Sequence, residues 1–520
     1  MSDYVQEAEL MTVGTKLSSE WIYKFYKALE ERGIENHGLL IMQNGETVFE
    51  EYAYPYSADM PHTLFSVTKS IVSTAAGFAI DEGLFSLDSE ILPFFPEYKA
   101  YESDEWKNVT VRSVLTMHSN KEFSFLQDMT GNYVEMFMKA PFRKKGRGFL
   151  YSNNDAHIVA ALVQKTAGMN LVEYLTPRLF EPLGIEPPLW ETNSVGECIG
   201  GTGAYLKLRD LAKICQCYAD GGKYNGKQII PEFWAKEAVK KQVPLGGREN
   251  EDGYGYLFWT DGDIFSMNGM FGQIVMYIPE HKAVIATLNC VVDDGKLATL
   301  LKTVLAKAFT ETSDKDWDDK LGNYLESRAQ KPVASKERIN IPTGVVYRMT
   351  PVHNKLAGFM FPASLIPRSL TSSFAKRPKS NLDRVSFETD ESTVTLRWYE
   401  EEDEIKVICG LDGTPRMSEC SIKGYKYKIW AYAYSENGKL NVVFKPINTL
   451  STQRFIFDFG KDYITIRMTG TPSFKEFILK NAGESSVISS APAPVRKIMV
   501  KTVDLVLSSI EMPLKYKATE

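Results

Sequence analysis

Apolar side chains recur every three to four positions through much of the first half of the chain. Trp21, Phe25 and Leu29 fall on one face of a predicted amphipathic helix near the N-terminus. Between about residues 64 and 240, four further helical runs alternate with glycine and proline breaks. This pattern predicts a helical region in the middle of the first half.

Strand-like runs flank the helical region on both sides. Asn44-Gly45 separates two such runs, and this dipeptide favours a type I′ hairpin because both of its residues accept a positive φ. A second hairpin is predicted over residues 273–289, with its turn at Pro279-Glu280. We expect the strands at the two ends to share one antiparallel sheet, with the helical lobe inserted between them.

The period of the pattern changes to two in the C-terminal part. Val394, Leu396 and Trp398 alternate with polar residues, and Asn437-Gly438 marks another hairpin. Such alternation is typical of an antiparallel sheet or barrel with one buried face. The predicted fold class is therefore α+β: an antiparallel sheet flanked by helices with an inserted helical lobe, followed by a C-terminal antiparallel, barrel-like β domain.

Composition changes along the chain predict the domain boundaries. Residues 311–340 are strongly charged and poor in large aliphatic side chains, which indicates a connecting segment with one short exposed helix. A "SSAPAP" stretch then precedes an amphipathic helix predicted over residues 495–510, which we expect to dock on the protein itself, with a membrane surface as the alternative. The predicted parts are the first domain, the linker, the β domain and a terminal linker with its helix, over residues 1–310, 311–340, 341–488 and 489–520.

Composition and charge exclude several classes of function. The 520 residues carry a net charge of −6 and no basic stripe interleaved with aromatic residues, so we expect no nucleic-acid partner. The six cysteines form no CxxC pair, and no histidine spacing suits a metal, so neither a metal nor another cofactor is expected. No transmembrane segment and no secretory signal is recognised, which predicts a cytoplasmic protein.

Ser66 and Lys69 are the first candidate for chemistry. They stand three residues apart at the head of an apolar, small-residue run, "SVTKSIVSTAAGF". On a helix this spacing puts both side chains on one face, where the amine can take the proton of the serine hydroxyl and make it a nucleophile. Spacing alone proves little, because Ser373 and Lys376 have it without such a run. A structural pair at the mouth of a buried helix is the alternative.

Tyr151 and Asn153 form the second candidate. They lie in "LYSNNDAHIVAAL", directly before a predicted helix, where a phenol and an amide can project into a cleft. A tyrosine beside a lysine can act as general base for the serine and then as general acid for the leaving group. Asn153 can bind a substrate carbonyl. Ser152 is the alternative to Tyr151 in this role, because Ser152-Asn153-Asn154 also has the form Ser-x-Asn.

With these motifs the sequence resembles the serine β-lactamase and penicillin-binding-protein superfamily, in its class C-like branch of β-lactamases, esterases and D-aminopeptidases. The stretches that carry the resemblance, in family order, are "FSVTKS", "VRSVLTMHSN", "YSNNDAHIVAALVQKTAG" and "NGMFGQIVMYIPEHKAVIATLN", within about residues 15–308. The resemblance implies an acyl-enzyme hydrolase whose active site lies between a sheet and a helical lobe.

The resemblance also implies residue roles. Ser66 would be the acylated nucleophile, Lys69 and Tyr151 the base pair, and Asn153 a substrate ligand. Met270, Phe271 and Gly272 would form the third motif beside the substrate, and the N–H groups of Ser66 and Gln273 would form the oxyanion hole.

Two departures from the family pattern bear on the substrate and on one loop. The third motif has Met270 where relatives have Lys or His, and methionine gives no charge-assisted hydrogen bond to a substrate carboxylate. We therefore expect an ester or a small amide or peptide as substrate, and no efficient β-lactamase. Asn120 replaces a family glycine in "VLTMHSN" and leaves the path of that loop open.

Other expectations concern rival functions and residues set aside. His118 and His157 are interpreted as structural, the glycines of "CIGGTGAYL" as a tight turn beside the cleft, and "GYGYLFW" as either core or an aromatic pocket. A catalytically silent binding or scaffold protein of the same fold and an acyltransferase are the alternatives to the hydrolase. A homodimer is left open.

Overall fold

We analysed a computed structural model of the chain. It describes residues 17–122, 132–144, 148–248, 251–292, 295–328, 332–333, 335–350, 384–400, 403–422, 425–471, 479, 501 and 513–519. The chain divides into two compact units, Met1–Ala329 and Gln330–Glu520. Among the described residues, no helix is both long and apolar enough to cross a lipid bilayer.

The first unit is built on an antiparallel sheet whose central strands come from opposite ends of the unit. Asn44 and Gly45 take positive φ angles of 53° and 84° and join β1 to β2 in the predicted hairpin. β1 pairs antiparallel with β12, so the expected meeting of the two ends is confirmed. In order across the sheet, its eight described strands are β2 (Glu46–Tyr52), β1 (Glu35–Gln43), β12 (Ala283–Cys290), β11 (Gln273–Ile278), β10 (Ile264–Gly269), β9 (Trp259–Asp261), β8 (Glu251–Tyr254) and β7 (Val243–Arg248).

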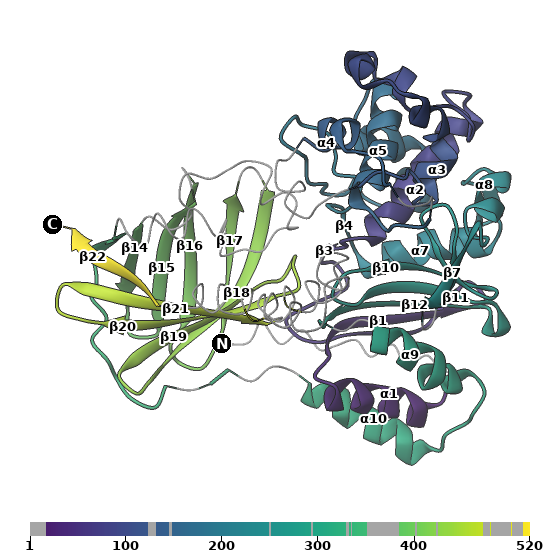
Figure 1. Cartoon of the computed structure of the whole chain (residues 1–520). Coiled ribbons are helices and arrows are strands. Elements are labelled where there is room, and N and C mark those ends of the chain that lie inside the picture. The colour runs from purple at the N-terminus through teal and green to yellow at the C-terminus, as the bar shows by residue number, and fades with distance from the viewer. Residues whose placement is uncertain are drawn as a thin grey trace. The chain divides into compact units, whose positions relative to one another are not determined.

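Helices cover both faces of this sheet (Figure 1). One face packs against α1 (Ser19–Glu31), α9 (Gly295–Thr303), η8 (Leu305–Phe309) and α10 (Lys315–Ser327). The other face carries the inserted lobe, which confirms the predicted helical region. Its helices are α2 (Val67–Asp81), η1 (Leu92–Phe94), η2 (Pro96–Tyr101), η3 (Asp104–Asn108), α3 (Val111–Leu115), α4 (Tyr133–Lys139), α5 (Asn153–Ala167), α6 (Leu171–Leu175), η5 (Thr176–Phe180), η6 (Glu181–Leu183), α7 (Leu208–Ala219) and α8 (Glu232–Glu237). Short elements complete the unit: β3 (His62–Thr63), β4 (Tyr205–Leu206), β5 (Lys223–Tyr224), β6 (Lys227–Gln228) and η7 (Pro279–His281).

The charged segment after residue 310 differs from the expected linker. It contains α10, a helix of 13 residues whose Leu321 and Leu325 are buried against the first unit. Asp314 caps this helix by accepting the backbone N–H of Trp317. Leu321 and Leu325 are its two buried side chains, and Tyr324 packs against the same core while partly exposed, so the sequence of the helix is dominated by charge although the helix packs on the unit.

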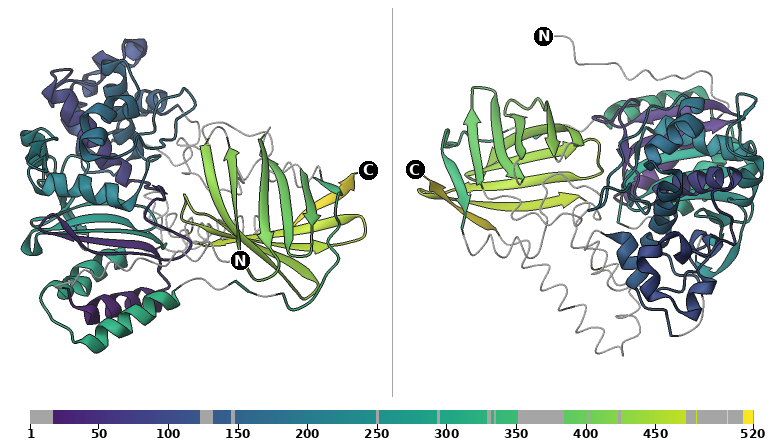
Figure 2. Two further views of the ribbon diagram at one scale, coloured as in Figure 1. Left: turned by 180° about the vertical axis from the view of Figure 1, so that it is seen from behind. Right: turned by 90° about the horizontal axis from the view of Figure 1, so that it is seen from above.

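The second unit is an antiparallel β-barrel, as expected (Figure 2). Its ten described strands follow one another in the order β16, β15, β14, β13, β22, β21, β20, β19, β18, β17, and a pairing of Gly410 with Tyr432 joins β16 to β18 and closes nine of them. The strands are β13 (Val346–Met349), β14 (Arg384–Thr389), β15 (Thr393–Glu400), β16 (Asp403–Gly410), β17 (Arg416–Ile422), β18 (Tyr425–Glu436), β19 (Lys439–Pro446), β20 (Thr452–Phe459), β21 (Tyr463–Thr471) and β22 (Leu514–Thr519). The alternating Val394, Leu396 and Trp398 of β15 point into its core.

The C-terminal segment contributes a strand that the sequence did not predict. β22 lies between β13 and β21 and pairs antiparallel with both. The sequence assigned residues 489–520 to a linker and a helix, whereas the described end of this segment belongs to the barrel. The predicted helix over residues 495–510 lies outside the described residues, apart from Lys501.

Candidate active site

Ser66 is the residue that begins the central helix of the lobe. It occupies the N-cap of α2, and its side chain is partly exposed. Phe65, directly before it, has a φ of 47°, an uncommon value for a residue with a large side chain. Backbone strain of this kind gathers at functional sites. The sharp turn at Phe65 thus presents Ser66 at the end of a helix that is otherwise almost wholly buried.

Lys69 lies one turn further along α2 and is buried, with 1% of its surface exposed. Its Nζ donates to Ser66 Oγ at 2.8 Å, to Asn153 Oδ1 at 2.7 Å and to the carbonyl oxygen of Gly201 at 2.6 Å. Three acceptors match the three N–H bonds of an ammonium group. The amine is therefore fixed in direct contact with the serine hydroxyl.

Tyr151 flanks the same amine, and its neighbour Ser152 does not. Lys69 Nζ lies 4.9 Å from the centre of the Tyr151 ring, and Trp259 stacks on that ring at 5.2 Å. Ser152 is buried and caps α5, because its Oγ accepts the backbone N–H groups of Asn154 and Asp155. The serine is thus occupied by the helix end, and the geometry favours Tyr151 in the second motif.

Gly201 is a site residue that the sequence interpretation missed. A Cβ on Gly201 would lie 2.8 Å from Asn153 Cβ, and one on Gly200 would lie 2.5 Å from Ala160 Cβ. The two glycines therefore let the backbone lie directly on α5 and bring the Gly201 carbonyl to Lys69. The signal was the Gly-Gly pair, which was interpreted only as a tight turn beside the cleft.

The third motif forms the turn between β10 and β11. Met270 is partly exposed, whereas Phe271 is buried and packs its ring against Phe65 at 5.3 Å. Phe271 and Gly272 both have positive φ angles, 66° and 88°. A Cβ on Gly269, at the end of β10, would lie 2.3 Å from the carbonyl oxygen of Leu64, so this strand end adjoins the segment that leads to Ser66.

Gln273 holds this turn in place. Gln273 is fully buried. Its side-chain Nε2 donates to the carbonyl oxygen of Asn289 at 2.8 Å, and its side-chain Oε1 accepts the backbone N–H of Asn289 at 3.2 Å. Nε2 also lies 3.3 Å from the carbonyl oxygens of Met270 and Phe271. The side chain of Gln273 therefore anchors the turn to β12. The role of the Gln273 backbone N–H in an oxyanion hole stays a prediction.

The two histidines set aside in the sequence have structural partners. His157 is buried, accepts the backbone N–H of Gly200 at Nδ1 and lies 3.3 Å from Glu197 through Nε2. His118 lies 2.7 Å from the carbonyl oxygen of Thr116 through Nδ1. His157 therefore braces the glycine loop against α5.

Asn120 adopts the backbone conformation that a glycine would supply. Its φ is 60°, in the left-handed region that asparagine tolerates better than most residues with a side chain. Its carbonyl oxygen accepts the backbone N–H of Arg143. The loop left open by the sequence therefore follows a path that requires left-handed backbone at this position.

The aromatic run "GYGYLFW" belongs to both the core and the site. Tyr254, Tyr256 and Phe258 are buried, whereas Trp259 stacks on Tyr151. Among the described residues, no group of three or more histidine, cysteine, aspartate or glutamate side chains is placed to hold a metal ion.

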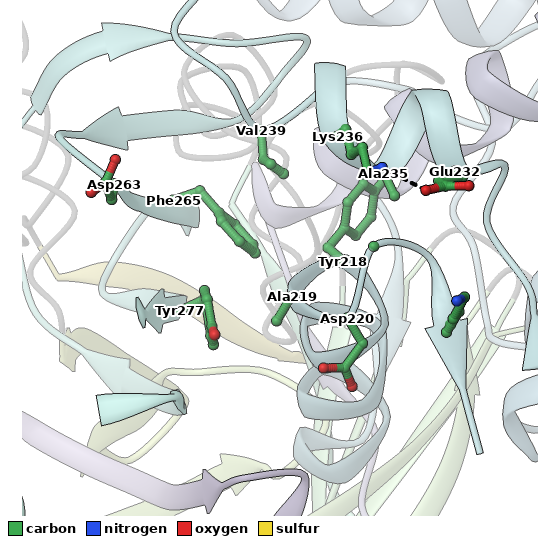
Figure 3. A pocket seen from close by; sticks show the side chains of 12 residues that line it. Tyr218, Ala219, Asp220, Glu232, Ala235, Lys236, Val239, Asp263, Phe265 and Tyr277 are labelled. Atoms are coloured by element: carbon green, nitrogen blue, oxygen red, sulfur yellow. Dashed lines mark hydrogen bonds and ion pairs between the residues drawn. The ribbon is translucent and has the colours of Figure 1, made fainter. Parts of the chain in front are cut away.

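A cavity of about 500 Å³ lies elsewhere in the first unit, between α7, α8 and the ends of β10 and β11. Figure 3 shows Phe265, Tyr277, Tyr218, Asp263 and Asp220 among the side chains that line it. None of its lining residues is a sequence-predicted site residue, and the cavity holds no arrangement like that of Ser66 and Lys69.

Comparison with known families decides the assignment. A model of the Beta-lactamase family matches residues 24–294, slightly more than half of the chain. The chain belongs to the beta-lactamase family. The match covers the stretch from α1 to the end of β12 and includes every sequence-predicted site residue.

Relatives of this beta-lactamase-family chain include named hydrolases. A 6-aminohexanoate-dimer hydrolase from Paenarthrobacter ureafaciens is 23% identical over 48% of this chain and 71% of its own length. A lovastatin esterase from Penicillium rubens is 25% identical over 29% of this chain and 45% of its own length. Among solved structures, an octameric penicillin-binding-protein homologue from Pyrococcus abyssi matches with a TM-score of 0.46 and 14% identity, over 86% of this chain and 97% of its own.

Proposed function

We propose that this chain is a serine hydrolase that attacks an ester or a small amide or peptide through an acyl-enzyme on Ser66. The observation that carries the proposal is the contact of a buried lysine amine with a partly exposed serine hydroxyl, Lys69 Nζ to Ser66 Oγ at 2.8 Å. Burying an amine costs several kcal/mol unless hydrogen bonds offset it. A protein that needed only to pack α2 would gain from an apolar residue at this position.

The proposed reaction uses the site residues in two half-reactions. In acylation, Ser66 Oγ forms a bond to the substrate carbonyl carbon, and its proton passes to whichever member of the Lys69–Tyr151 pair is unprotonated, the Lys69 amine or the Tyr151 phenolate. The oxyanion is held by the N–H of Ser66 and by a second N–H from the β10–β11 turn, for which Gln273 is the candidate. The bond to the leaving alcohol or amine then breaks, and the leaving group takes the proton. Water attacks the acyl-enzyme in the same way and releases the acid.

The substrate proposal follows from the residues around the third motif. Met270 is uncharged and lies at the turn. Asn268, the next residue but one before it, donates from Nδ2 to the carboxylate of Glu251 at 3.3 Å. A methionine and a carboxylate give no charge-assisted bond to a substrate carboxylate. We therefore propose an ester or a small amide without a carboxylate at that end, with Asn153 as the amide that binds its carbonyl group.

Labelling with a fluorophosphonate probe tests this function. Wild type is expected to react at Ser66 and to hydrolyse p-nitrophenyl esters, and Ser66→Ala is expected to do neither. Ser373→Ala removes the serine of the second Ser-x-x-Lys pair and serves as the matched control, which should behave as wild type. If wild type is neither labelled nor active, the silent binding protein is the better interpretation. Labelling of wild type combined with equal labelling of Ser66→Ala would show that another serine reacts.

Two further arms of the assay separate the remaining alternatives. Rapid turnover of a chromogenic cephalosporin would contradict the inference drawn from Met270. An acyltransferase shares the first half-reaction, so added alcohols or amines are tested as acyl acceptors. Faster release of p-nitrophenol together with a new ester or amide product would favour transfer over hydrolysis.

A further inference from the structure

Asp155 is a buried carboxylate that the proposed reaction does not use. It lies in the first turn of α5, two residues after Asn153, with 1% of its surface exposed. Asp155 Oδ1 accepts a hydrogen bond from the Ser119 hydroxyl at 2.9 Å, and Asp155 Oδ2 accepts one from the Ser119 backbone nitrogen at 3.4 Å. Ser119 belongs to the loop of residues 116–121, so the carboxylate ties this loop to the start of α5.

The loop of residues 116–121 contains unfavourable backbone conformations that such ties must offset. Met117 and Asn120 both have φ angles in the left-handed region, 58° and 60°. Conformations of this kind cost of order 1–3 kcal/mol for residues other than glycine. Lys121 supplies a second tie, because its Nζ donates to the carbonyl oxygen of Ala140 at 2.9 Å and lies 3.8 Å from the centre of the Trp106 ring.

The same loop touches the chain on both sides of Tyr151. The backbone N–H of Leu150 donates to the carbonyl oxygen of Met117 at 3.0 Å. The backbone N–H of Ser152 donates to Met117 Sδ at 3.4 Å. Met117 thus supports Tyr151 through both of its neighbours, and the position of Met117 depends on how the loop is held.

We propose that Asp155 is a positioning residue that holds the loop of residues 116–121 against α5 and thereby sets Tyr151 and Asn153 in place beside Lys69. This inference rests on the proposed function, because it concerns the rate at which Ser66 reacts. Displacements of about 1 Å in an active site can cost about 100-fold in rate, so a support of this kind can control catalysis.

The ionisation of Asp155 gives this role a measurable pH dependence. Burial raises the pKa of Asp155 to about 7, although its bonds with Ser119 oppose the shift. Of the described residues, the charged group facing it is Lys121, whose own pKa is lowered by burial to about 7 and which faces Glu105. Above pH 7 the ionised carboxylate accepts both Ser119 donors, and below pH 7 one oxygen carries a proton and becomes a donor, so the carboxyl group holds the two Ser119 donors less strongly. The rate should therefore fall as the pH falls through about 7.

The test measures the rate constant for labelling of Ser66 by a fluorophosphonate probe between pH 5.5 and 9, on the full chain. Asp155→Asn is expected to react about 10- to 100-fold more slowly at pH 8 and to lose the pH step near 7, because the amide resembles the protonated acid at every pH. Ser119→Ala should give a smaller loss, with the step at higher pH, because the hydroxyl that lowers the Asp155 pKa is gone. Asp104→Asn removes an exposed carboxylate paired with Lys107 and should match wild type.

The outcomes separate this inference from the proposed function. An unlabelled Ser66 in wild type would defeat the function itself. Wild-type labelling with an Asp155→Asn variant that keeps the wild-type rate and pH profile would overturn only the positioning role. If Asp155→Asn does not fold, as judged by circular dichroism, Ser119→Ala decides: a wild-type rate and an unshifted step overturn the inference. The positioning role of Asp155 would also be overturned if the change in labelling rate near pH 7 were lost in Lys121→Met and kept in Asp155→Asn.

Discussion

The first unit buries eight histidine, lysine, aspartate or glutamate side chains among its described residues, and the second unit buries one, Lys445. The second unit instead fills its barrel with alternating aromatic and aliphatic side chains such as Phe387, Trp398 and Phe457. Both units have hydrophobic cores, so the difference lies in the number of buried histidine, lysine, aspartate and glutamate side chains. The eight are His37, His62, Lys69, Lys121, Asp155, His157, Glu191 and Asp210.

This difference agrees with the placement of the proposed active site in the first unit. Each buried ionisable group costs folding energy unless its partners offset the lost solvation. Half of the eight lie on α2, α5 and the loop of residues 116–121, in or directly beneath the candidate site: Lys69, Lys121, Asp155 and His157. The described core of the barrel consists of packed apolar side chains.

Replacing one buried lysine in each unit should give the largest contrast. Lys69→Met keeps a side chain of similar length and removes the amine that contacts Ser66, so labelling by the fluorophosphonate should fall by about 1000-fold or more. Lys445→Met removes the buried lysine of β19 and should leave labelling unchanged. Kinetics of probe incorporation measures both. Similar losses in the two variants would contradict the separation of roles.

A matched pair of fully buried tryptophans tests stability in the same way. Trp234 packs against Gly77 of α2 and stacks on Tyr256, whereas Trp398 lies in the barrel core. Truncation of either to alanine should cost about 3–5 kcal/mol in its own unit because a large cavity is left. In calorimetry, Trp234→Ala should lower the melting temperature of the first unit's transition, and Trp398→Ala that of the second unit's transition. The labelling of Ser66 should be slower only in Trp234→Ala. A single transition lowered by both would show that the units unfold together.

Gly201→Ala probes the carbonyl that fixes Lys69. The added Cβ would lie 2.8 Å from Asn153 Cβ, so the loop must move away from α5 and take the acceptor of the lysine amine with it. We expect a loss of about 10- to 100-fold in the labelling rate. Gly413→Ala, at a turn of the barrel where a Cβ meets nothing within 4 Å, controls for glycine replacement as such, although its φ of 79° adds local strain. An unchanged rate for Gly201→Ala would remove this carbonyl from the site.

The smallest expected effect concerns acid stability. His62 Nε2 lies 3.0 Å from His37 Nδ1, and burial, followed by the nearby His37, lowers the pKa of His62 to about 3. An unfolded histidine binds a proton near pH 6.5, so the unfolded state takes up the proton first and stability falls as the pH drops below about 6.5. Between pH 6.5 and 5 wild type should lose roughly 1.5 kcal/mol more than His62→Gln.

Urea unfolding of the first unit at the two pH values measures this difference. The second unit carries one histidine, His353, which is the same in both proteins, so its transition serves as an internal reference for this comparison. An equal pH dependence in wild type and His62→Gln would show that the histidine pair accepts a proton without cost.

The features of the two units that depend on periodicity and on local motifs could be predicted from the sequence. The hairpin at Asn44-Gly45, the helical lobe and the alternation in β15 each follow from spacing between neighbours, and the structure confirms them. The Ser66–Lys69 contact follows from helical geometry in the same way. Asn153 was expected at the site, but as a substrate ligand, and the structure shows it also holding Lys69.

The features that were missed depend on the backbone or on distant partners. The Gly201 carbonyl belongs to a residue without a side chain, so residue type carried little information about its role. Asp155 meets Ser119 across 36 positions, and nothing local to either residue reveals the bond. β22 finds its place between two strands far away in the sequence, and its six residues carry no strong strand signal of their own.

The left-handed backbone at Asn120 has a consequence for finding other proteins of this kind. A search pattern that demands glycine at the end of the stretch that reads "VLTMHSN" here rejects this chain, although Asn120 takes the left-handed backbone conformation that glycine adopts readily. A pattern written in terms of conformation, which admits asparagine and aspartate there, would retain it. Collections of homologues assembled with the stricter pattern will therefore under-represent the chains that solve this turn with a side chain.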